Sequence, residues 1–146
     1  MIKEVKIIPE EINLFHIDIL ESSIKDLSKK EVLGFNLNVA HTTMHNLKAQ
    51  RVKIGLVIDL DTESKEVEGK AHFVIDFHFQ IENLNNFYEF KESGEPLFSG
   101  MLISTLIALS FSTARGIIFE RLSNTNLQGI MLPVVDPKKM LALNSK

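Results

Sequence analysis

Two pairs of histidine and aspartate residues are the strongest candidates for chemistry in this sequence. His16 and Asp18 are two positions apart, and so are Asp76 and His78. On a strand, residues two apart point to the same face, so each pair presents an imidazole beside a carboxylate. Such a pair can act as a base, bind a metal ion weakly, or respond to pH near neutrality. The alternative, which we favour, is a cross-strand charge pair that only holds the strands in register.

Two other clusters resemble metal sites only in part. His41 and His45 have the i, i+4 spacing that binds metal on a helix, but the Thr-Thr pair between them favours a strand. On a strand these histidines lie ~13 Å apart, too far to share one ion. An acidic cluster near a predicted turn lacks the glycine and the ligand spacing of a calcium loop; it consists of Asp59, Asp61 and Glu63. We therefore expect no metal, no cofactor and no enzymatic activity.

The elements that position these residues show a period of two. The segment 70–82 places Ala, Phe and Ile side chains on one face and charged or polar ones on the other, which predicts a half-buried strand. The same alternation appears over 51–61, over 13–19 and, more weakly, over 34–45. Short polar links without a helical crossover predict antiparallel hairpins. The segment 21–32 is expected to be a longer connection with some helical potential.

The last third predicts a long helix and then a short one. The segment 101–122 is apolar on nearly every side, whereas a helix with one buried face carries a single apolar stripe. We therefore expect this helix to be covered on two sides, through self-association. Ser99 is a suitable N-cap, and the short helix would begin at Asp136 and end at Leu143. The predicted interface residues are Leu102, Ile103, Leu106, Ile107, Ser110, Ala114 and Ile117.

Four strands followed by two helices predict an α+β fold, with both helices on one face of an antiparallel sheet. The 146 residues, 1–146, are expected to form one domain. The net charge of −3 does not indicate a basic surface for binding nucleic acid. The sequence contains no cysteine. The longest uncharged run in the helix, 101–114, falls short of the ~20 residues that span a bilayer. With no signal peptide in 1–9, we expect a cytoplasmic protein without membrane insertion.

This order of elements resembles the SecB family of protein-export chaperones. The family's long helix carries an Ala-Arg dipeptide preceded by an aromatic residue, matched here by Phe111, Ala114 and Arg115. A Leu-x-Pro-Val/Ile-Asn-Phe-like turn into the last helix follows in the family, and 132–136 reads Leu-Pro-Val-Val-Asp. Met140 and Leu141 occupy the family's apolar helix positions. The architecture resembles the family over 11–143, and the sequence itself over 111–141.

The resemblance implies a homotetramer in which two dimers sandwich their long helices. It also implies an ATP-independent chaperone that holds unfolded or nascent polypeptide clients for export, with the motor SecA as a candidate partner. The alternatives are a SecB-like chaperone that serves a toxin–antitoxin pair, or a small-ligand-binding or enzymatic α+β domain that uses the His/Asp face. The predicted client groove consists of Leu27, Val32, Leu33, Phe35, Leu37, Met44, Val134, Met140 and Leu141.

Overall fold

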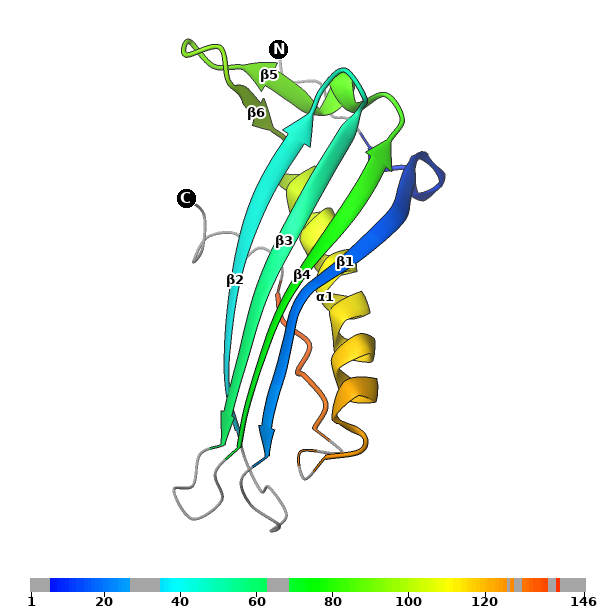
Figure 1. Ribbon diagram of the computed structural model, residues 1–146. Coiled ribbons are helices and arrows are strands. Elements are labelled where there is room, and N and C mark those ends of the chain that lie inside the picture. The colour runs from blue at the N-terminus through cyan, green and yellow to red at the C-terminus, as the bar shows by residue number, and fades with distance from the viewer. Residues whose placement is uncertain are drawn as a thin grey trace.

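A twisted antiparallel sheet with one long helix across it forms the body of the protein (Figure 1). The computed structural model describes residues 6–26, 35–62, 69–125, 127, 130–136 and 139. The sheet has the strand order β1-β4-β3-β2. Its strands are β1 (Ile12–Asp26), β2 (Phe35–Asn46), β3 (Arg51–Thr62) and β4 (Gly69–Ile81). The helix, α1 (Gly100–Leu122), packs on one face, and the predicted α+β class is confirmed.

The core lies between this helix and the sheet. Alternate residues of β3 and β4 point toward α1 and are fully buried, as the period of two predicted. The largest of them are Ile54, Leu56, Ile58, Phe73, Ile75, Phe77, Phe79 and Ile81. Ser99 caps α1, because its Oγ accepts a hydrogen bond from the backbone N–H of Leu102. Each strand packs one apolar face against α1. The opposite face of the sheet carries mainly polar residues.

The buried side of α1 is broader than a single stripe. Six of the seven residues predicted for an oligomer interface are buried inside the protomer: Leu102, Ile103, Leu106, Ile107, Ser110 and Ala114. The seventh, Ile117, is partly buried and packs against the same core. The helix is long and apolar enough to cross a membrane, but half of its most apolar stretch is buried within the protein. The sheet thus already covers most of the surface that the sequence had assigned to a partner.

β1 differs from its predicted course in two ways. It continues to Asp26, where a connection had been expected, because residues from Glu21 onward pair with β4 from Val74 to Gly69. Its register also shifts twice, once between Leu14 and His16 and once between Ile19 and Glu21. Such bulges change which face a side chain meets. They account for the position of Phe15, which an unbroken alternation over 13–19 would place on the apolar face. Its ring is instead exposed, and the guanidinium carbon of Arg51 lies 4.6 Å from the ring centroid.

A small hairpin lies between the main sheet and α1 in the chain. After the 3-10 helix η2 (Leu84–Phe87), β5 (Tyr88–Phe90) pairs with β6 (Pro96–Phe98) and projects beyond the end of the main sheet (Figure 1). Gly94 adopts φ 87 in its turn, a conformation that costs glycine little. The backbone N–H of Lys91 closes the turn by donating to the carbonyl oxygen of Glu95 at 2.8 Å.

The chain after α1 returns along the helix side of the sheet (Figure 1). Ile130 and Leu132 are buried there, and Arg115 Nε donates a hydrogen bond to the carbonyl oxygen of Leu132 at 2.8 Å. The arginine of the Ala-Arg dipeptide therefore fixes the closing segment to the helix. The short helix predicted for 136–143 lies outside the described residues except at Asp136 and Lys139, and α1 is the one α-helix with both of its ends among the described residues.

Candidate functional site

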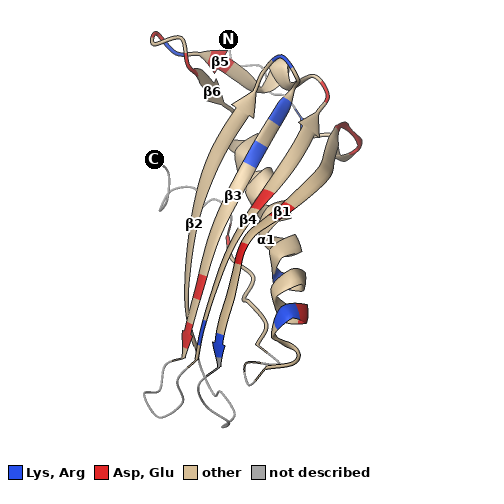
Figure 2. Cartoon of the chain, in the orientation of Figure 1, with Lys and Arg blue, Asp and Glu red and all other residues tan. Residues whose placement is uncertain are grey.

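The face of the sheet opposite α1 carries charged residues from three strands, β1, β4 and β3 (Figure 2). Because β1 and β4 are neighbours, three of the four residues of the two His/Asp pairs lie together there: His16, Asp18 and His78. His16 Nε2 lies 2.7 Å from one oxygen of Asp18, and His78 Nε2 lies 3.2 Å from the other. Carboxylates only accept hydrogen bonds, so both imidazoles donate. Asp76 stays outside this cluster and pairs with Lys53 Nζ at 3.6 Å.

These contacts change the acidity of Asp18. The hydrogen bond from His16 is the main reason that its pKa lies below the ordinary value, while partial desolvation opposes the shift and the hydrogen bond from His78 adds to it. Asp18 is therefore ionised across the physiological range. The cluster joins β1 to β4 through charge-assisted hydrogen bonds, which agrees with the register-holding role favoured from the sequence.

A second cluster, centred on His72, had not been singled out in the sequence. His72 Nδ1 lies 2.5 Å from an oxygen of Asp59, and its Nε2 lies 2.8 Å from an oxygen of Glu21. Because ionised carboxylates only accept hydrogen bonds, both contacts are satisfied when both ring nitrogens of His72 carry protons, the form in which the ring is a cation. The hydrogen bond with Asp59, followed by that with Glu21, raises the pKa of His72 above its ordinary value. This imidazolium bridges three adjacent strands, β3, β4 and β1.

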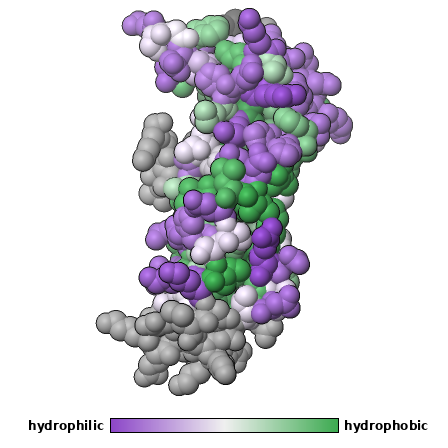
Figure 3. All heavy atoms as spheres, viewed as in Figure 1, coloured by the Kyte–Doolittle hydropathy of each residue, from purple (hydrophilic) through white to green (hydrophobic). Residues whose placement is uncertain are grey.

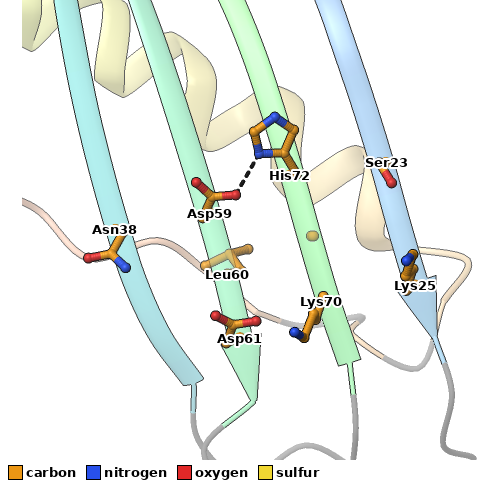
Figure 4. Close-up of a pocket in the computed structure, with 9 residues that line it drawn as sticks. Ser23, Lys25, Asn38, Asp59, Leu60, Asp61, Lys70 and His72 are labelled. Atoms are coloured by element: carbon orange, nitrogen blue, oxygen red, sulfur yellow. Dashed lines mark hydrogen bonds and ion pairs between the residues drawn. The ribbon is translucent and has the colours of Figure 1, made fainter.

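An open pocket of about 420 Å³ lies beside this imidazolium (Figure 4). Positive and negative side chains both line the pocket. Lys25 lies on β1, Lys70 on the neighbouring strand β4, and Asp61 on β3, the strand next to β4. The remaining lining residues are Ser23, Asn38, Asp59, Leu60, Ala71 and His72. Among the described residues, no three His, Asp or Glu side chains are arranged to hold a metal ion. The described part of the polar face offers hydrogen bonds and ion pairs.

The residues predicted for a client groove are distributed over two faces. Phe35 and Leu37 point toward the helix side of β2 and pack against the core, half-buried. Met44, on the opposite face of β2, is 58% exposed, and Val134 of the closing segment is 82% exposed. The other five lie outside the described residues: Leu27, Val32, Leu33, Met140 and Leu141. Met131 is also exposed and had not been predicted.

Apolar side chains are also exposed elsewhere. Figure 3 shows hydrophobic residues across the middle of the polar sheet face, where Ala40, Val57 and Val74 are register partners. On the outward side of α1, Met101, Leu109 and Phe119 are exposed. A hollow of about 260 Å³ there is lined by Ser104, Thr105, Ala108, Leu109 and Ser112. Small residues let a second helix approach closely, so this outward face is suited to helix packing.

Comparison with known proteins supports the fold. No protein-family model and no curated protein matches the sequence. The SecB-like chaperone Rv1957 of Mycobacterium tuberculosis, solved in complex with a ChAD peptide from the antitoxin HigA1, matches with a TM-score of 0.61 at 11% identity, over 86% of this chain and 88% of that one. A Streptococcus agalactiae protein of unknown function matches with a TM-score of 0.47 at 13% identity, over 84% of this chain and 97% of that one. The SecB-like resemblance is thus confirmed at the level of the fold.

Proposed function

We propose that this SecB-like fold serves as an ATP-independent chaperone that holds unfolded polypeptide segments. The proposal is carried by exposed apolar side chains on both sides of the sheet: Met44 on the edge strand β2, and Met131 and Val134 on the closing segment. An edge strand can accept an extended peptide as an additional strand, and neighbouring apolar side chains then contact alternate residues of that peptide.

Methionine suits such a surface because its flexible, polarizable side chain packs against many different partners. Affinity from apolar contact and backbone pairing is tolerant of sequence, as a holding chaperone requires. Binding to the unfolded state of a client shifts the client's folding equilibrium by mass action and needs no nucleotide. Held in this way, a client is kept from aggregating until it is released.

We also propose a cytoplasmic homo-oligomer, with a homotetramer as the form that the SecB resemblance implies. The outward face of α1 supports this proposal, because it combines exposed Leu109 and Met101 with the small-residue hollow. Protein export, with SecA as a partner, remains a prediction from the same resemblance.

A second candidate role is service to a toxin–antitoxin pair. The observation that favours it is the likeness to the Mycobacterium tuberculosis SecB-like chaperone, which was solved with an antitoxin peptide. In that role the client would be one particular segment of an antitoxin. The third alternative, a small-ligand-binding domain, would use the pocket beside His72.

The test is suppression of aggregation of a chemically denatured model substrate. We expect the wild-type protein to suppress aggregation without ATP, and the double substitution Met44→Ser and Val134→Ser to weaken suppression while the melting temperature hardly changes. The matched control is Leu20→Ser, since Leu20 is also 58% exposed but lies on β1, at the opposite edge of the sheet. A wild-type protein that leaves aggregation unchanged would refute the chaperone role and favour the ligand-binding alternative.

A further inference from the structure

Two lysines in the pocket beside His72 face each other across neighbouring strands. Lys25, near the end of β1, and Lys70, near the start of β4, are register partners. Lys25 follows Ile24, which packs against the core, so its own side chain lies on the opposite, polar face of the sheet. Ammonium groups placed in this way repel each other and weaken the pairing of the two strands.

This repulsion distinguishes the two lysines from the other cationic residues of the polar face. Lys53 forms an ion pair with Asp76, and the three histidines of this face each contact a carboxylate. Within the part of the chain that the structure describes, no ion pair includes Lys25 or Lys70. The two ammonium groups are therefore open to a partner that does not belong to these residues.

The acidic residues of the pocket do not balance both lysines. Asp61 on β3 is the register partner of Lys70, so this row of the sheet has one carboxylate for two ammonium groups. Asp59, the other acid in the lining, is hydrogen-bonded to His72. The row thus keeps a surplus of one positive charge beside the pocket, and an anionic group placed between the two lysines would balance it.

The pocket also offers uncharged hydrogen-bond donors. Ser23 lies opposite His72 on β1, and Asn38 lies opposite Asp59 on β2, so all four strands contribute to the lining (Figure 4). A hydroxyl group and a side-chain amide can both donate to the oxygen atoms of a ligand. The volume of about 420 Å³ falls within the ~300–1,000 Å³ that is typical of small-molecule pockets.

We propose that this pocket binds a small molecule through an oxyanion, a carboxylate or a phosphate group, that bridges the ammonium groups of Lys25 and Lys70. Ser23 and Asn38 donate hydrogen bonds to the ligand from the two sides of the pocket. The inference gives a ligand class to the third alternative above, and it does not require chaperone activity. A bridging anion replaces the repulsion between β1 and β4 with two attractions, so binding stabilises the folded protein.

The test titrates the folded protein with lactate or with inorganic phosphate at constant ionic strength, while two-dimensional NMR follows the backbone amides. We expect saturable shifts of the amides around Lys25 and Lys70, with a Kd of about 5 mM or tighter for at least one probe. The probe with the lower Kd identifies the preferred group. The double substitution Lys25→Gln and Lys70→Gln should abolish saturation. The matched control is Lys48→Gln, an exposed lysine between β2 and β3 and outside the pocket, which should leave the Kd unchanged.

A second measurement tests the repulsion itself. Without ligand and at low salt, Lys25→Gln should raise the melting temperature, because Lys70 then faces an uncharged side chain, and added ligand should no longer raise it further. A lower melting temperature for Lys25→Gln would contradict the repulsion on which the site rests. Shifts that do not saturate by about 50 mM of either probe, or that saturate equally in the double variant, would overturn the proposal. Suppression of aggregation is measured separately, so failure of the anion site leaves the chaperone proposal standing, and the reverse also holds.

Discussion

Asp18 on β1 and Asp76 on β4 stand directly opposite each other in the sheet register. Like charges in such positions destabilise a sheet. Here each carboxylate has its own partners. His16 and His78 contact the carboxylate of Asp18, and Lys53 forms an ion pair with Asp76. The pairing of β1 with β4 on the polar face therefore depends on these partners.

Replacing Lys53 with Met should destabilise the protein by roughly 0.5–1 kcal/mol, because Asp76 then faces Asp18 without its own cation. The measurement is urea-induced unfolding at neutral pH. The control is the Asp76→Asn variant, which removes the repulsion between Asp18 and Asp76. In that variant, Lys53→Met should lower the free energy of unfolding by less than it does in the wild type. Equal effects in both backgrounds would show that Lys53 acts through its packing rather than its charge.

The charged His72 should make stability depend on pH near neutrality. Its pKa is raised in the folded state, so its contribution is present in full below the unfolded value of ~6.5 and is lost as pH rises through the folded value. NMR titration of the imidazole should show the raised pKa, and Asp59→Asn should lower it more than Glu21→Gln does. The control is His72→Gln, in which this part of the pH dependence of unfolding should disappear. An ordinary pKa for His72 would contradict the three-strand bridge.

The buried and exposed sides of α1 should respond differently to truncation. Ile107 is fully buried, so Ile107→Ala should cost ~2–5 kcal/mol through lost contacts and a cavity. Met101, exposed on the same helix, should tolerate Ala with a change of less than ~0.5 kcal/mol. Thermal or urea unfolding of the two variants distinguishes them. A charge at Ile107 should for the same reason unfold the protomer instead of separating subunits, and a folded, dissociated Ile107→Asp variant would contradict its place in the core.

The outward face of α1 should control assembly. Leu109 is 43% exposed beside the small-residue hollow, so Leu109→Asp should place a charge in the proposed contact while the protomer stays folded. Analytical ultracentrifugation should show an oligomeric wild type and a smaller particle for the variant. Leu20→Asp, a charge at an exposed position of the edge strand β1, is the control and should leave the mass unchanged. A monomeric wild type at micromolar concentration would refute the oligomer itself.

The strands and the long helix could be predicted because their patterns are local. The alternation over 70–82 and 51–61 marks β4 and β3, and it also separates the core side chains from the polar ones. Pairings between distant strands were harder to predict. Glu21 was placed in a connection, so its meeting with His72 was missed, although Asp59 and His72 already lay on the polar faces of two strands joined by one turn.

Bulges and short elements explain the remaining differences. The register shift after Leu14 moves Phe15 away from the core, and no residue type in the sequence marks that position. The hairpin strands have three residues each, too few for a period of two to be recognised. The oligomer interface was assigned from apolar residues of α1 that the broad, twisted sheet covers, because a sequence pattern does not reveal how wide a partner surface is.

The strand order has a consequence for how the chain folds. β2, β3 and β4 can pair in sequence, through turns that join neighbouring segments, whereas β1 pairs only with β4, so that Ile12 meets Ile81. Closing that long loop is the entropically costly step, and it cannot occur until β4 has been synthesised. We therefore expect β1, which is synthesised before β2, β3 and β4, to be the last of these four strands to join the sheet. Until it does, the β4 edge is open, so this protein passes through a state with the kind of unpaired strand edge that chaperones protect.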